Sequence, residues 1–164
     1  MKQTTPRKDT MNPVNSELVW LASAVDFEGS ILMYPNWNPK GISTSIRANT
    51  TVLTNTNPVL LRYARKLLTK YNINHRLVPL YKGKKWSKKW KKAWRVEVSP
   101  VDDNKILLEL LLPYLIGKKR QCEIALEFLF NHNSKHNKHR KTTEHEWKLM
   151  LKCQALNKRG VVNP

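Results

Sequence analysis

Two carboxylates, Asp26 and Glu28, close an apolar segment and stand just before Gly29. The chain holds 12 acidic residues against 30 basic ones, so two acids this close together are unexpected. They lie where a helix beginning near Ser16 should end, and acidic side chains at a helix C-terminus oppose the helix dipole. Such departures from local rules often mark functional positions. Carboxylate oxygens suit a hard divalent ion such as Mg²⁺, which can activate water for phosphodiester hydrolysis.

The overall charge favours a polyanionic partner. A formal net charge of +18 exceeds what solubility requires, and it favours nucleic acid first and an anionic membrane second. Residues 82–92 contain seven lysines and two tryptophans without an acid, a composition that suits phosphate contact and stacking. The lysines expected to contact DNA are Lys84, Lys85, Lys88 and Lys89 in this run, and Lys135, Lys138 and Lys141 in a second basic loop.

Neither membrane insertion nor secretion is expected. The longest apolar runs fall well short of the ~20 residues that a spanning helix needs. Residues 1–13 carry Lys2, Arg7 and Lys8 among polar residues, so they are interpreted as a flexible basic arm. They lack the apolar centre of a secretory signal. Cys122 and Cys153 are expected to be buried free thiols, which is consistent with a reducing, intracellular location.

The remaining residues, 14–164, are predicted to form one α/β domain of the α+β type, because 164 residues fit a single core. Apolar spacing and turn residues predict the element order αββαββαα with a final helix. The predicted helices cover residues 16–25, 58–71, 102–112 and 117–130. Ser16 is expected to cap the first helix, Asn57 to cap the second with Pro58 as its first residue, and Pro113 to interrupt the third. A capping box at Thr143 is expected to open the last helix. The predicted strands cover residues 30–34, 43–55, 74–81 and 93–99.

Alternation along these strands would present one polar face. Antiparallel strands can enter the major groove of DNA, where arginine reads guanine and asparagine reads adenine through paired hydrogen bonds. Any exposed antiparallel sheet is polar on one face, so the pattern alone is a weak signal. The candidate base-reading residues are Arg47, Asn49, Thr51, Arg76 and Arg95, extended by Tyr34, Asn36 and Asn38.

Leu21–Gly29, which runs Leu-Ala-Ser-Ala-Val-Asp-Phe-Glu-Gly, resembles the LAGLIDADG motif of homing endonucleases. In that family an acid at the helix end holds a divalent metal at the cleaved phosphate. The resemblance therefore implies Glu28 as metal ligand and Mg²⁺ as cofactor, with Ca²⁺ able to replace it without supporting cleavage. It also implies Asn55 and Lys118 as the polar residue and the lysine around the attacking water. Pro113–Gln121 is the second segment that resembles the family.

The same resemblance implies the LAGLIDADG fold, αββαββα with C-terminal helices and a four-stranded antiparallel saddle over double-stranded DNA. One chain carries one motif and one Glu28, so two chains must combine to cut both strands. The expected homodimer interface is the small-residue helix face with Leu21, Ala22, Ser23 and Val25. The expected reaction is a double-strand break in a long pseudo-palindromic site, usually at an intron or intein insertion site.

Several residues depart from the family pattern. Ser23 and Phe27 replace small residues that are common in the motif, and Val59 and Leu60 stand where homodimeric relatives often carry an arginine. Two alternative functions would use the same basic sheet. One is a maturase that binds intron RNA, and the other is a DNA-binding regulator without catalysis. Charge alone does not separate these three functions.

Overall fold

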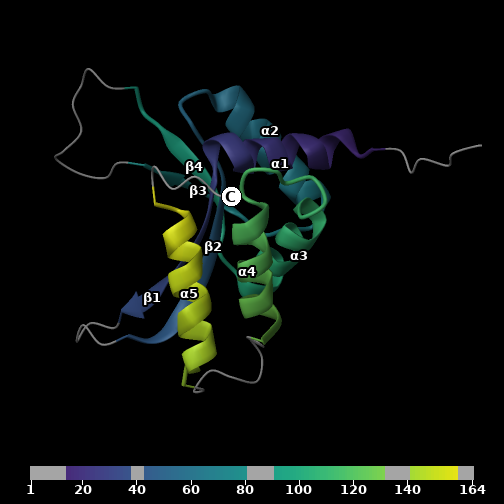
Figure 1. Cartoon of the computed structure of the whole chain (residues 1–164). Coiled ribbons are helices and arrows are strands. Elements are labelled where there is room, and N and C mark those ends of the chain that lie inside the picture. The colour runs from purple at the N-terminus through teal and green to yellow at the C-terminus, as the bar shows by residue number, and fades with distance from the viewer. Residues whose placement is uncertain (1–13, 38–42, 81–90, 132–140, 159–164) are drawn as a thin grey trace, which may run out of the picture.

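The structure is a computed structural model that describes residues 14–37, 43–80, 91–131 and 141–158. Its elements follow the predicted order, αββαββααα (Figure 1). The helices are α1 (Ser16–Glu28), α2 (Pro58–Lys70), α3 (Val101–Leu111), α4 (Lys119–Asn131) and α5 (Glu144–Leu156). The strands are β1 (Ser30–Trp37), β2 (Ser43–Asn55), β3 (Arg76–Pro79) and β4 (Trp94–Val98).

The four strands form one antiparallel sheet in the order β1-β2-β4-β3. Successive side chains of a strand point to opposite faces. In β1, Ile31 and Met33 are buried at 0% and 2% exposure, whereas Leu32 and Tyr34 are each 36% exposed. The helices pack on the first face, and no described helix covers the second, which is called the open face below (Figure 1). The predicted α+β fold with a four-stranded antiparallel sheet is therefore confirmed.

The core lies between the sheet and its helices. It includes Leu21 of α1, Leu108 of α3 and Phe128 of α4, each at most 1% exposed. Cys122 and Cys153 are buried free thiols, as predicted, and burial raises their pKa values to about 12 and about 11. Among the described residues, no helix combines the length and apolar character needed to cross a membrane.

Side-chain caps open α1, α2 and α5. The predicted cap Asn57 and the first-turn Pro58 open α2, and Thr143 forms the predicted capping box of α5. The predicted cap of α1 was one residue off, because Asn15 and not Ser16 accepts the first free N–H groups. The helix also continues to Glu28, beyond the predicted range of 16–25. Asn15 and Ser16 are both good capping residues, so the sequence alone does not show which one is used. The packing of the helix decides it.

The second strand pair is shorter than predicted. Residues 74–81 were expected to be extended throughout, but β3 begins at Arg76. The Asp103 carboxylate accepts the backbone N–H of Asn74 at 2.8 Å and its side-chain amide at 3.1 Å. Because these bonds tie Asn74 to the first turn of α3, it does not join the ladder with β4.

Candidate functional site

Gly29 brings the end of α1 directly against β2. The helix ends at Glu28, but Gly29 has a φ of −104°, so it is not the left-handed cap that ends many helices. A Cβ atom at Gly29 would lie 2.3 Å from the carbonyl oxygen of Thr51 and 2.8 Å from that of Val52. Glycine is required here because the two backbones approach so closely. This close approach fixes the position of the acidic helix end on the sheet.

Asp26 is fully engaged with backbone donors. Its Oδ2 accepts the N–H groups of Ile116 at 2.8 Å and Gly117 at 3.2 Å, and its Oδ1 accepts that of Lys118 at 2.8 Å. These N–H groups stand at the start of α4, where the positive end of the helix dipole stabilises a carboxylate. Asp26 therefore joins the α3–α4 turn to the end of α1.

Lys118 lies at the same helix end. Its Nζ donates to the backbone carbonyl of Asp26, one of the carbonyls that a helix C-terminus leaves without an internal partner. The ammonium also complements the negative end of the α1 dipole. Burial lowers the pKa of Lys118 below its usual 10.5, and the Asp26 carboxylate opposes this shift. The fold thus brings Lys118 within a short distance of the acidic segment, 92 residues earlier in the chain.

Glu28 has very different surroundings from Asp26. It is exposed, and within the described ranges its carboxylate has no hydrogen bond or ion pair. The described part of the chain contains no cluster of three or more His, Cys, Asp or Glu side chains that could hold a metal ion. At the end of α1, Glu28 is therefore an exposed carboxylate with no partner among the described residues.

Asn55 is the last residue of β2, opposite Trp94 of β4. Its Oδ1 accepts the backbone N–H of Asn57 at 2.8 Å, which shapes the turn into α2. Its side chain makes no hydrogen bond to Glu28 or Lys118 in this structure. Of the three predicted site residues, the fold brings Lys118 to the end of α1, whereas Asn55 has a local role in the turn.

The predicted dimer interface on α1 requires correction. Leu21, Ala22 and Val25 are each 0% exposed, because they pack against the core of their own chain. Only Ser23 of the predicted set is exposed. Phe27, one turn further on, is 85% exposed. The prediction was wrong for the three core residues because α1 is apolar on both sides, so periodicity could not identify its outer face.

Two of the predicted base-reading residues are also corrected. Arg47 is exposed on the open face of the sheet, but Asn49 and Thr51 on the same face are only 6% and 5% exposed. Asn49 Oδ1 accepts a hydrogen bond from the Ser99 hydroxyl at 3.3 Å, and Thr51 lies opposite Glu97 of β4. Side chains on and just after β4 cover this half of β2, so neither residue is free to contact a base.

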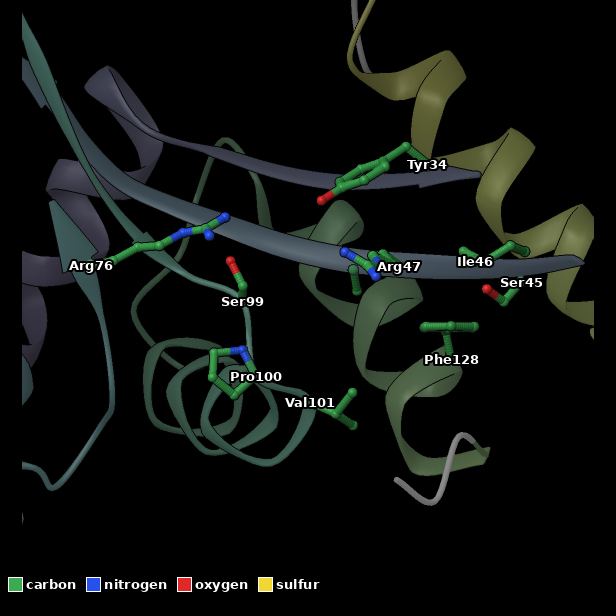
Figure 2. Close-up of a pocket in the computed structure, with 10 residues that line it drawn as sticks. Tyr34, Ser45, Ile46, Arg47, Arg76, Ser99, Pro100, Val101 and Phe128 are labelled. Carbon is green, nitrogen blue, oxygen red and sulfur yellow. The ribbon is translucent and has the colours of Figure 1, made fainter. Parts of the chain in front are cut away.

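Beyond the end of β4, a hollow of about 330 Å³ lies beside β2 and is lined by residues from both faces of the sheet. Figure 2 shows the guanidinium groups of Arg47 and Arg76 and the Tyr34 hydroxyl on one side of β2, with Phe128 on the other. Nearby, Asn36 donates from Nδ2 to the Ser45 hydroxyl at 3.3 Å. The hollow therefore combines cationic and hydroxyl groups with apolar side chains such as those of Val101 and Phe128.

Several predicted DNA-binding residues lie outside the described ranges. Lys141 is described and is exposed before α5. The basic arm of residues 1–13 and the lysine run of residues 82–90 receive no structural description. The candidate DNA-binding residues that fall outside are Asn38, Lys84, Lys85, Lys88, Lys89, Lys135 and Lys138.

Sequence reasoning missed Glu97, which lies between the two predicted arginines of the second strand pair. Its carboxylate is 2% exposed, and it forms ion pairs with Arg76 Nη2 at 3.1 Å and with Arg95 Nε. Arg76 Nε also donates to Glu97 Oε2 at 3.1 Å. The alternation of β4 places Arg95 and Glu97 on one face, but only the pairing with β3 brings Arg76 beside them.

The sheet and the helices packed on it form the LAGLIDADG fold. The chain superimposes on the homing endonuclease I-CvuI in complex with a DNA target at a TM-score of 0.64 and 18% identity, covering 91% of this chain and 86% of that one. It matches the archaeal intron-encoded homing endonuclease I-Vdi141I, complexed with DNA, at a TM-score of 0.64 and 15% identity, over 89% and 87% of the two chains.

A longer protein shares the same fold. The LAGLIDADG homing endonuclease I-GzeII, in complex with its DNA target, superimposes at a TM-score of 0.56 and 15% identity, covering 85% of this chain and 43% of that one. No protein-family model and no curated protein matches the sequence. At these identities the similarity establishes the fold, and the chemistry must be argued from the residues.

Proposed function

We propose that this protein is a site-specific DNA endonuclease that makes a metal-dependent double-strand break as a homodimer. The observation that carries the proposal is the end of α1, where the exposed Glu28 carboxylate has no partner among the described residues and Lys118 donates to the nearby Asp26 carbonyl. Three further properties support it: the net charge of +18, the open sheet face with its arginines, and a fold shared with DNA-bound homing endonucleases.

The residues suggest a division of roles in the reaction. When bound, Mg²⁺ would activate water and neutralise charge on the departing oxygen, and the hard carboxylate of Glu28 suits this ion. Lys118 would place a cation near the scissile phosphate, where it could stabilise the transition-state charge. Asp26 would hold Lys118 through the short turn before α4. Asn55, at the end of β2, would orient water only if DNA binding released its side chain from the hydrogen bond to Asn57.

A single chain offers one Glu28, whereas a double-strand break requires two cleavage events. We propose that two chains meet along the outer face of α1, which carries Ser23 and the exposed Phe27. A two-fold axis beside this face would bring two copies of Glu28 together. An exposed phenylalanine at the helix end is explained by such an interface, because burial there would remove its apolar surface from water.

The proposed activity is tested by finding the target and then measuring its cleavage. Duplexes bound in Ca²⁺ are selected from a randomised pool and cloned into a plasmid, which is then incubated with the wild-type protein and Mg²⁺. We expect nicking followed by linearisation in Mg²⁺ and binding alone in Ca²⁺. Selective binding without cleavage would favour the DNA-binding regulator, and preference for intron RNA over the selected duplex would favour the maturase.

The dimer is tested by replacing Ser23 with leucine. A larger side chain at a close helix contact should weaken association by about 1–3 kcal/mol through overpacking. Sedimentation measurements should show a shift from dimer to monomer, with the melting temperature of the chain nearly unchanged. Thr69→Leu, on the exposed face of α2, is the matched control and should leave association intact. A monomeric wild type that cuts both strands at high dilution would refute the two-fold arrangement.

A further inference from the structure

Glu97 is the single acidic residue within the four strands β1 to β4. Its side chain belongs to the open face of the sheet, because it is opposite Thr51 on one side and Arg76 on the other. Its neighbours in β4, Val96 and Val98, point into the core at 0% exposure. A carboxylate on this face repels phosphate. The basic character of the protein as a whole therefore does not explain why an acid stands here.

The carboxylate is buried while its two partners are not. Glu97 is 2% exposed, whereas the side chains of Arg76 and Arg95 are 63% and 40% exposed. Arg76 binds one carboxylate oxygen, Oε2, and Arg95 binds the other, Oε1. Arg76 is therefore held at one edge of its guanidinium group, because its Nε and Nη2 both contact Oε2. Arg95 is held differently: its buried Nε is ion-paired with Oε1 without the geometry of a hydrogen bond.

This arrangement limits what the arginines can bind. A free arginine at a surface samples many rotamers and pairs with any phosphate within reach. A guanidinium group fixed at one edge keeps a planar set of donors in a single orientation, which suits the two acceptors of a guanine edge. The negative charge of Glu97 also offsets part of the positive charge, and so reduces the attraction to phosphates of any sequence.

We propose that Glu97 is a specificity-determining positioning residue, which fixes Arg76 and Arg95 for base reading and suppresses their non-specific phosphate contacts. The inference rests on the proposed DNA binding, but it does not depend on cleavage. Glu97 acts through the two arginines and does not itself touch DNA. Its replacement should therefore reduce discrimination between sequences and at the same time strengthen binding to unrelated DNA.

The test measures binding in Ca²⁺ by full-length wild type, Glu97→Gln and Glu97→Asp to two duplexes. One duplex is selected by the wild type from a randomised pool, and the other is a scrambled duplex of the same composition. For Glu97→Gln we expect the affinity ratio to fall about 10- to 100-fold. The affinity for the scrambled duplex should rise, and its log K against log[salt] slope should steepen by about 0.9 for each arginine released to a phosphate.

Glu123→Gln is the matched control. It removes the same charge from another arginine pair, in which Arg120 Nη1 lies 2.9 Å from Glu123 Oε2, but this pair is on α4 and away from the sheet face. We expect this control to leave the affinity ratio unchanged. Glu97→Asp keeps the charge but is too short to reach both arginines, so discrimination should fall while the salt slope stays near that of the wild type.

The outcomes separate this inference from the proposed nuclease activity. If the wild type selects a sequence but does not cut it, the test of Glu97 still stands. Wild-type discrimination in both Glu97 variants would overturn the inference, and so would a wild type that selects no sequence. If thermal melting showed that both variants are unfolded, Glu97 would be assigned to stability and the inference would also fail.

Discussion

Two regions of this basic protein hold acidic side chains in opposite ways. On the open sheet face, Glu97 is buried and shared by two arginines. At the end of α1, Asp26 is shared by three backbone N–H groups, while Glu28, two residues away, is exposed and has no partner within the described residues. A carboxylate with a complete set of donors shapes its surroundings, whereas one without donors remains available to an ion.

The comparison also explains why the two acids at one helix end are not equivalent. Both carry the same charge and both oppose the helix dipole, yet Asp26 accepts hydrogen bonds from three backbone N–H groups. Glu28 gains none from the described part of its own chain. We therefore expect Asp26 to act on the fold and on the position of Lys118, and Glu28 to act on chemistry alone.

The largest effect is expected from Glu28→Gln. The amide has almost the same shape but lacks the charge that holds a hard divalent cation, so cleavage should fall by at least about 10²–10³-fold. Binding in Ca²⁺ and the melting temperature should change little, because the Glu28 carboxylate bonds to no other described residue. Plasmid linearisation and gel-shift assays measure the two properties. Glu109→Gln, an exposed acid on α3, is the charge-matched control, and undiminished cutting by Glu28→Gln would remove Glu28 from the mechanism.

Asp26→Asn should show the opposite balance between stability and activity. Replacing the ionised acceptor weakens three hydrogen bonds, so we expect a decrease of about 1–3 kcal/mol in the free energy of unfolding. Cleavage should also fall, because the turn that positions Lys118 loosens. Urea unfolding, compared with Glu28→Gln, measures the difference. Equal stability of the two variants would contradict the division of roles between these acids.

The lowered pKa of Lys118 predicts a pH dependence. Its charged form is disfavoured in the folded chain, so a rate that requires the ammonium should decline as the pH rises through this lowered pKa, before 10.5 is reached. The free energy of unfolding should rise with pH across the same window. In that range the unfolded chain binds more protons than the folded one, because burial disfavours the charged lysine only in the folded state. Single-turnover rates of Lys118→Arg should stay flat over that range. An alkaline limb that is identical in both proteins would assign the titration to another group.

The smallest effect is expected from four lysines of the basic run, all outside the described residues. Replacing Lys84, Lys85, Lys88 and Lys89 with glutamine should flatten the salt dependence of binding by about 0.9 in slope for each phosphate that these lysines no longer neutralise. Discrimination between sequences should survive, in contrast to the effect expected for Glu97→Gln. Binding titrations from low to moderate salt measure both properties. An unchanged slope would show that the run does not bind DNA.

Much of the architecture could be predicted from the sequence because local signals act within a few residues. The Asn57 and Pro58 start of α2, the Thr143 capping box and the break at Pro113 depend on neighbouring backbone groups, and each was found where predicted. The acidic helix end before Gly29 was also apparent, although the glycine is needed for its close approach to β2 and not for a left-handed turn.

Contacts between distant segments depended on tertiary structure. The apolar spacing of α1 could not show which side faces its own core, so Leu21, Ala22 and Val25 were assigned to the wrong surface. Strand alternation placed Asn49 on the polar face but could not show that Ser99 covers it. The spacing of apolar residues shows which residues share one side of a helix or strand. Only the packing of the fold decides what lies against that side.

The sequence by itself therefore determined the order of elements, the basic character and the pair of acids at the end of one helix, because these follow from composition and short-range spacing. Tertiary structure decided which acid is engaged. Asp26 meets N–H groups about 90 residues away, and Glu97 meets Arg76 across a strand pair 21 residues apart in the chain. A carboxylate's role depends on the donors around it, and donors this distant in sequence are brought together only by the fold.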